Sequence, residues 1–253
     1  MLRKIAAVKP ILNISAYLFV TLSDPAAWRE SIRSQASALG LKGTVLLAEE
    51  GINLFLAGRA AEVHRFVGWL RRDACFESLA PKESWSDDVP FGKLLVKVKR
   101  EIIRMNHPAI RPAAARAAAV DAATLARWLD AGCDDAGRPV VMLDTRNAFE
   151  VDQGRFAGAV DWRITKFSEF PQAVLAYRAA LAGCTVVSYC TGGIRCEKAA
   201  IFMAEAGVEN VLQLDGGILK YFEEVGSRHF DGDCFVFDAR SAVDASLAAV
   251  PVS

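Results

Sequence analysis

The chain has 253 residues, of which 53% are hydrophobic and 24% charged, and its 30 basic residues balance 30 acidic ones. These values are typical of a soluble globular protein with one large domain or two ordinary ones, and they exclude a disordered chain. A net charge of zero also excludes a global electrostatic field for nucleic acid, so any RNA site must be a local patch.

The sequence indicates neither a membrane protein nor a secreted one. No apolar run approaches the ~20 residues that a membrane span needs. Residues 1–20 are basic and then apolar, as in a signal peptide, but Lys9, Pro10 and Asn13 interrupt the apolar run. The six cysteines form no CxxC pair and the three histidines are scattered, which indicates neither a metal site nor a disulfide scaffold. We therefore expect a cytoplasmic protein with reduced thiols and no bound metal.

The N-terminal part of the chain alternates strand and helix patterns, and Glu49-Glu50-Gly51 joins two of the strands as a hairpin. The order strand, helix, strand, strand, helix, strand is typical of the ferredoxin-like or acylphosphatase-like α+β arrangement, which we assign to residues 1–106. The predicted strands are 11–20, 43–48, 52–58 and 93–103, and the predicted helices are 25–40 and 60–74.

The last predicted strand of this domain carries alternating basic residues. Lys97 and Lys99 share one face, opposite Val96 and Val98. A solvated face of a half-buried strand explains this alternation without any function. The alternative is a stripe that contacts RNA phosphates, which makes Lys97 and Lys99 candidate RNA-binding residues.

Two prolines and many alanines in residues 107–120 argue against a continuous helix, so we place a linker between two domains there. Beyond it, alternating strands and helices predict an α/β domain, residues 121–240, with a central parallel sheet flanked by helices. Residues 241–253 follow as a C-terminal tail. The predicted helices are 122–132, 171–183 and 197–207, the predicted strands are 139–145, 185–189 and 208–218, and 148–160 is expected to hold a short helix, a turn and a closing strand.

The segment from Cys190 to Cys196, CTGGIRC, follows a predicted buried strand and precedes a predicted helix. In a parallel sheet this places the segment at the edge where ligands bind. Backbone N–H groups of a loop with two adjacent glycines converge on an anion, and the same field favours a thiolate over a thiol. With Arg195 close by, we expect Cys190 to have a lowered pKa and to be nucleophilic.

Topology brings two further strand ends to the same edge, one with Asp144 and Arg146 and the other with Asp215. A cysteine, a short loop and an arginine occur together in both protein phosphatases and sulfurtransferases. Four residues separate Cys190 from Arg195, whereas phosphatase loops are longer, because they must fit a tetrahedral phosphate. The shorter loop resembles that of the rhodanese family, whose active-site cysteine carries a persulfide.

Four motifs together are similar to the bacterial tRNA uridine hydroxylase family. They are CTGGIRCEKAA, LDTRN, the EEGIN hairpin after GTVLLA, and GDCFVFDAR at 232–240. The resemblance covers both domains, residues 11–240, and implies a ferredoxin-like domain followed by a rhodanese-like domain. It also implies an enzyme that uses molecular oxygen as co-substrate and tRNA as partner, and that converts the wobble uridine to 5-hydroxyuridine. No cofactor is evident in the sequence.

The resemblance implies roles for the residues of these motifs. Cys190 would be the required cysteine and Arg195 would hold its electrostatics, while Asp144 and Arg146 would brace the loop from the neighbouring strand. Cys196 has two interpretations, either a thiol that resolves an oxidised or persulfidated Cys190 or a packing residue of the helix–sheet core. The amide cradle around the sulfur would come from Thr191, Gly192, Gly193 and Ile194.

Two chemistries remain open for Cys190. Its thiolate can add to C6 of uracil and make C5 electron-rich, as hydroxylation requires, or a Cys190 persulfide can take part. The alternative function is a rhodanese-type sulfurtransferase that passes sulfur through the Cys190 persulfide. The attached domain with its basic strand favours the hydroxylase, and the intact cysteine and glycines argue against a silent RNA- or protein-binding module.

Overall fold

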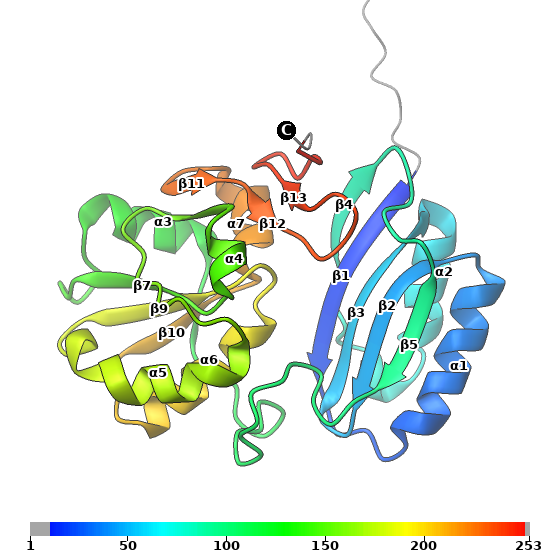
Figure 1. Cartoon of the computed structure of the whole chain (residues 1–253), viewed down its shortest axis with the longest axis horizontal. Coiled ribbons are helices and arrows are strands. Elements are labelled where there is room, and N and C mark those ends of the chain that lie inside the picture. Colours follow the sequence, from blue (N-terminus) through cyan, green and yellow to red (C-terminus); the bar gives the residue numbers. More distant parts are fainter. Residues whose placement is uncertain (1–10, 251–253) are drawn as a thin grey trace, which may run out of the picture.

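The computed structural model describes residues 11–250, which form two sheet-containing halves (Figure 1). The described part does not include residues 1–10 or 251–253. Lys9 and Pro10, which interrupt the apolar run near the N-terminus, lie outside it. No helix within residues 11–250 is long and apolar enough to cross a bilayer.

The N-terminal half is a five-stranded sheet with two helices on one face. Its strand order is β4-β1-β3-β2-β5, and β2 and β3 form the hairpin that the sequence predicted. The expected ferredoxin-like, acylphosphatase-like α+β arrangement is thus confirmed. The elements are β1 (Ile11–Phe19), α1 (Pro25–Ala38), β2 (Lys42–Ala48), β3 (Gly51–Arg59), α2 (Ala60–Leu70), a 3-10 turn (Ala74–Phe76), β4 (Lys82–Ser86) and β5 (Leu94–Val98).

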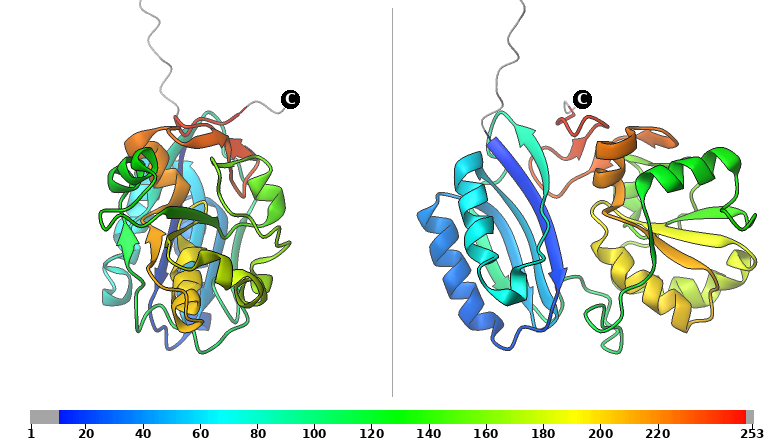
Figure 2. Two further views of the ribbon diagram at one scale, coloured as in Figure 1. Left: turned by 90° about the vertical axis from the view of Figure 1, so that its left-hand side faces the viewer. Right: turned by 180° about the vertical axis from the view of Figure 1, so that it is seen from behind.

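The two helices leave one face of this sheet open. Asp24 caps α1 by accepting a hydrogen bond from the Ala27 N–H at 2.9 Å, and Pro25 stands in the first turn. α1 and α2 pack on the outer face of the sheet, so the opposite face is turned toward the second half of the chain (Figure 2). The side chains that α2 buries against the sheet are Val63, Phe66, Val67 and Leu70.

The fourth strand of the arrangement is not where the sequence placed it. β4 lies in a segment expected to be turns, and it pairs antiparallel with β1 so that Lys82 is opposite Ser15. The strand predicted at 93–103 is shorter, because β5 covers only 94–98 and pairs parallel with β2 at the other edge. The sequence KESWS of β4 hides its strand character, since polar residues dominate both faces and leave no apolar alternation.

The second half is a four-stranded parallel sheet covered on both faces, which confirms the predicted α/β class. The strand order is β6-β10-β9-β7; α5 and α6 pack on one face, α3 and α7 on the other. The elements are β6 (Ala119–Val120), α3 (Ala122–Ala131), β7 (Val140–Asp144), α4 (Ala148–Val151), β8 (Gly154–Phe156), a 3-10 turn (Phe167–Glu169), α5 (Phe170–Tyr177), a 3-10 turn (Arg178–Leu181), β9 (Thr185–Tyr189), α6 (Ile194–Glu205), β10 (Val211–Leu214), α7 (Gly217–Val225), β11 (Phe230–Gly232), β12 (Cys234–Phe235) and β13 (Ala242–Val243).

Several short strands of this half differ from the sequence expectation. The predicted linker 107–120 ends in β6, which pairs with β10. Within 148–160 the structure adds β8, which pairs antiparallel with β11, and the expected strand at the close is a single parallel bridge between Val160 and Leu143. The predicted tail contains β13, which pairs with β12 and buries Val243. Strands of two or three residues are too short for any hydrophobic period, so only their pairing reveals them.

Candidate active site

Cys190 stands directly after β9, where the central parallel strand meets a glycine turn that opens α6. The Gly193 N–H donates a hydrogen bond to Cys190 Sγ over 3.1 Å. Gly193 has a φ of +97°, and a Cβ there would lie 2.9 Å from the Tyr17 hydroxyl. A Cβ at Gly217 would lie 2.4 Å from the Cys190 carbonyl oxygen. Both glycines are therefore required by close backbone approach to the loop.

The other residues of the predicted cradle have different roles. The Thr191 hydroxyl lies 3.4 Å from the Phe235 carbonyl oxygen, and Ile194 packs against Ile102 of the N-terminal half. A backbone hydrogen bond from Arg195 also lowers the pKa of Cys190. Thr191 and Ile194 thus anchor the loop to its surroundings.

Arg195 is held by a carboxylate that the sequence analysis did not identify. Its Nη1 and Nη2 donate to Glu150 Oε1 and Oε2 at 2.6 and 2.7 Å, and both side chains are buried. Glu150 belongs to the capping box of α4, in which its Oε1 accepts from the Asn147 N–H at 3.1 Å. The sequence shows Glu150 only as a helix-capping residue, because its second partner is 45 positions away.

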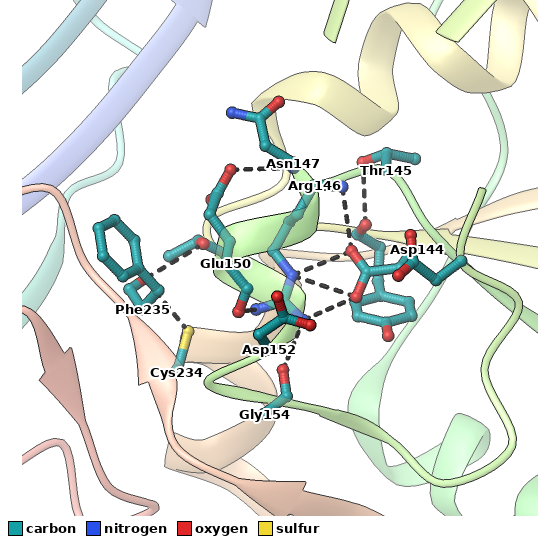
Figure 3. A network of polar contacts seen from close by, with 12 residues as sticks. Asp144, Thr145, Arg146, Asn147, Glu150, Asp152, Gly154, Cys234 and Phe235 are labelled. Atoms are coloured by element: carbon teal, nitrogen blue, oxygen red, sulfur yellow. Dashed lines mark hydrogen bonds and ion pairs between the residues drawn. The ribbon is translucent and has the colours of Figure 1, made fainter. Parts of the chain in front are cut away.

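Asp144 and Arg146 form a buried ion pair beside α4 (Figure 3). Arg146 is fully buried, donates to Asp144 at 2.6 Å and to the Gly154 carbonyl at 2.7 Å, and so holds α4 with its Glu150 in place. The direct brace is Thr145, whose N–H and hydroxyl both donate to the Tyr189 carbonyl, at 3.0 and 2.9 Å.

The two cysteines of the loop have opposite pKa shifts. Burial acts to raise the pKa of Cys190, but a hydrogen bond from Cys196 and the positive charge of Arg195 outweigh it and lower the pKa to about 5. Burial and the neighbouring Cys190 sulfur hold the pKa of Cys196 well above its usual value. At neutral pH the pair is a Cys190 thiolate and a Cys196 thiol. The Cys196 side chain is fully buried, and its sulfur lies 3.7 Å from the Thr145 hydroxyl.

A buried lysine of α6 connects the second half of the chain to the N-terminal half. Lys198 of α6 has 1% of its side chain exposed, and its Nζ lies 2.8 Å from Glu50 Oε2 and 2.7 Å from Glu101 Oε2. It also donates to the Ile103 carbonyl at 3.0 Å. Glu50 is the second acidic residue of the EEGIN hairpin, and its Oε1 accepts from the Ile102 N–H at 2.7 Å. The hairpin motif thus joins the two halves rather than lining the cysteine site.

The GDCFVFDAR motif forms a second connection. Arg240 pairs with Asp238 at 2.6 Å and donates to Ser84 Oγ of β4 at 2.8 Å. The Ala239 N–H donates to the Pro90 carbonyl at 3.0 Å. This segment lies between the two halves (Figure 1).

A cleft of about 860 Å³ opens between the sheet face of the N-terminal half and the loop, with Cys190 at its border. Lys99 borders this cleft, whereas Lys97, opposite Leu46 on the same sheet face, does not. Within residues 11–250 no cluster of three His, Cys, Asp or Glu side chains could hold a metal ion. The basic side chains of the cleft are Lys82, Lys99, Arg100, Arg104, Lys166, Arg195 and Arg240, and its aromatic side chains are Tyr17, Phe55, Phe91, Phe167 and Phe237.

Comparison with known proteins identifies relatives of the whole chain. Residues 11–102 match the model of the UPF0176 acylphosphatase-like domain, and residues 121–224 match that of the rhodanese-like domain. A protein from Variovorax paradoxus is 64% identical over 96% of this chain and 92% of its own length. A protein from Bordetella pertussis is 66% identical over 94% of this chain and 98% of its own length. Both relatives are named tRNA uridine(34) hydroxylase.

We predict that Cys196→Ala raises the pKa of Cys190 above about 5, because burial then acts with one opposing hydrogen bond fewer. Cys196→Ser keeps a donor and should leave the pKa low. Thiolate absorbance followed between about pH 4 and pH 9, with Cys190→Ser as the blank, measures both. An unchanged pKa in Cys196→Ala would mean that Arg195 and the amides alone stabilise the thiolate.

For the buried cation, we predict that Lys198→Met lowers the free energy of unfolding by about 3 kcal/mol, because it leaves two partly buried carboxylates without their partner. The matched control is Lys166→Met, whose pair with Glu169 is exposed and worth about 0–1 kcal/mol. Urea unfolding of each variant measures the difference. Equal losses for the two variants would contradict a structural role for Lys198.

Proposed function

Because this chain belongs to the tRNA uridine(34) hydroxylase family, we propose that it hydroxylates uridine 34, the wobble nucleoside of tRNA, to 5-hydroxyuridine. The observation that carries the proposal is a Cys190 sulfur with a pKa lowered to about 5 at the border of a cleft of about 860 Å³. That volume is in the range that small-molecule sites occupy. It suits one nucleoside displaced from the anticodon stack better than a small sulfur donor.

The thiolate accounts for activation of the uracil ring. Addition of Cys190 Sγ to C6 moves the C5–C6 electron pair toward the C4 carbonyl, and the resulting enolate is nucleophilic at C5. We propose molecular oxygen as the oxidant that C5 then meets. Insertion of one atom of O₂ leaves the other to be reduced to water, so a reductant must supply two electrons. Loss of the C5 proton and of Cys190 completes the cycle.

The N-terminal half is our candidate for holding tRNA. The segment after β5 lines the cleft with three basic side chains, those of Lys99, Arg100 and Arg104. Lys166 lines it from the second half. These four cations suit phosphates flanking nucleoside 34. Phe237 is 50% exposed at the cleft and offers a ring on which a neighbouring base can stack. In this division residues 1–106 hold RNA, residues 121–240 carry the chemistry, and the reaction takes place in the cytoplasm.

The sulfurtransferase alternative uses the same loop but leaves these features without a role. A persulfide on Cys190 needs the amides of the loop, not an aromatic and basic cleft built from a second domain. The shared name of the relatives likewise favours the hydroxylase.

The proposal predicts that a strain lacking this gene loses 5-hydroxyuridine-derived nucleosides from its tRNA. Complementation with the wild type should restore them, whereas Cys190→Ala should not, because no thiolate is left to activate the ring. Cys184→Ala, a half-buried cysteine outside the loop, is the matched control and should restore them fully. Mass spectrometry of digested tRNA makes the measurement. Unchanged nucleosides in the deletion strain, with no paralogue present, would refute the proposal.

We further predict that the double variant Lys99→Ala and Arg100→Ala, in the basic segment after β5, binds tRNA more weakly and with a flatter salt dependence. Loss of two phosphate contacts should reduce the slope of log affinity against log salt by roughly 1.5. Lys42→Ala, an exposed lysine of β2 outside the cleft, should leave the slope unchanged. Filter binding at several salt concentrations measures it. If the slope of log affinity against log salt is the same in the double variant, these basic residues form only a solvated surface.

A further inference from the structure

A lysine of the N-terminal half lines the cleft that Cys190 borders. Lys82 lies on the edge strand β4, opposite Ser15 in register, and therefore on the open face of the sheet. Its Nζ lies 5.4 Å from the centre of the Tyr17 ring, and the Tyr17 hydroxyl is the atom that a side chain at Gly193 would strike. Lys82 borders the same cleft as Cys190, so its ammonium group and the thiolate face one space.

This ammonium group lacks the partner that the other inward-facing lysines have. Lys198 is held by two carboxylates, and Lys220 pairs with Asp215 at 2.5 Å. Among residues 11–250, no carboxylate lies within ion-pair distance of Lys82, although the side chain is half-buried. A half-buried cation without a paired anion carries a desolvation cost, and an anionic group of a ligand in the open space beside it would compensate the charge.

We propose that Lys82 is a catalytic residue supplied by the N-terminal half, and that its ammonium group binds O4 of the target uracil. The proposal rests on the function proposed above. When the Cys190 S–C6 bond forms, the C5–C6 π pair shifts to C4–C5 and the C4 carbonyl pair moves onto O4. Lys82 donates a hydrogen bond to this developing oxyanion. The step needs no oxidant, because no electrons leave the adduct.

Two effects of the cation can be separated by pH. Lys82 also favours the Cys190 thiolate, so its removal slows addition at low pH merely by raising the pKa of Cys190. Once the pH is high enough for a complete thiolate in both proteins, any remaining loss of rate reports stabilisation of O4. Removing one donor to an oxyanion costs about 10²–10³-fold in rate.

The alkaline side of the profile gives a second signature. Burial lowers the pKa of Lys82, while nearby negative groups oppose the shift. The wild-type rate should rise as Cys190 loses its proton and fall as Lys82 loses its own, below the usual lysine range. Lys82→Met should lack the falling limb, and Lys82→Arg should carry its charge to higher pH. The groups around Lys82 are Cys190, Glu197, Asp215, Lys220 and the Tyr17 ring.

The experiment measures covalent adduct formation without oxygen, using tRNA with 5-fluorouridine at position 34. We expect the wild type and Lys82→Arg to form the Cys190 adduct, and Lys82→Met to form it about 100-fold more slowly on the plateau between the titration of Cys190 and that of Lys82. The affinity for tRNA should change less than about twofold, because one phosphate-independent contact is lost. Lys42→Met, an exposed lysine outside the cleft, should behave as the wild type.

The outcomes separate the two proposals. A rate deficit of Lys82→Met that disappears on the plateau where Cys190 is fully ionised and Lys82 still carries its proton, or equal rates at every pH, would overturn the role at O4 while leaving the hydroxylase assignment intact. A wild type that makes 5-hydroxyuridine but no adduct would also overturn the inference alone. A wild type that makes neither would refute the proposed function itself.

Discussion

The arrangement of the molecule depends on one buried cation. Lys198 follows the cysteine loop by two positions, and its Nζ is shared between Glu50 of the β2–β3 hairpin and Glu101 beyond β5. A charge removed from water is tolerated only with such partners, so the pair of carboxylates sets where the N-terminal sheet lies relative to α6. Because α6 begins at the loop, the same interaction places the open sheet face opposite Cys190. The cleft is therefore a consequence of this contact as much as of either fold.

Much of the fold could be read from the sequence because its signals are local. The helices and the longer strands have clear hydrophobic periods and caps, as at Asp24 and Gly132. β4 and β6 could not be found in this way, since they are short and their strand character comes from pairing with β1 and β10. A strand that exists only through its neighbour leaves no period in its own residues.

The residues of the site also divide into those with a local sequence signal and those without one. Cys190, the glycines and Arg195 lie in one segment, and a strand–loop–helix pattern is sufficient to place them. The sequence did not reveal Glu150 and Lys198, because their partners lie 45 and 148 positions away. It did not reveal Lys82 either, because the cleft that Lys82 borders forms only between the two halves. Such residues resemble ordinary surface charges until the two halves are brought together. The sequence likewise left two interpretations of Cys196 open, because it does not show which way the side chain at the start of a helix points.

The complete burial of the Cys190 side chain has a chemical consequence of its own. A thiolate at neutral pH is the form that peroxides attack, and stepwise oxidation beyond the sulfenic state is largely irreversible. An enzyme that handles an oxidant beside such a sulfur is exposed to self-inactivation in every idle moment. Here the Tyr17 and Ser15 side of the sheet lies over the glycine turn and shields the sulfur from solvent. The N-terminal half thus protects the reactive sulfur between turnovers, in addition to any part it plays during them.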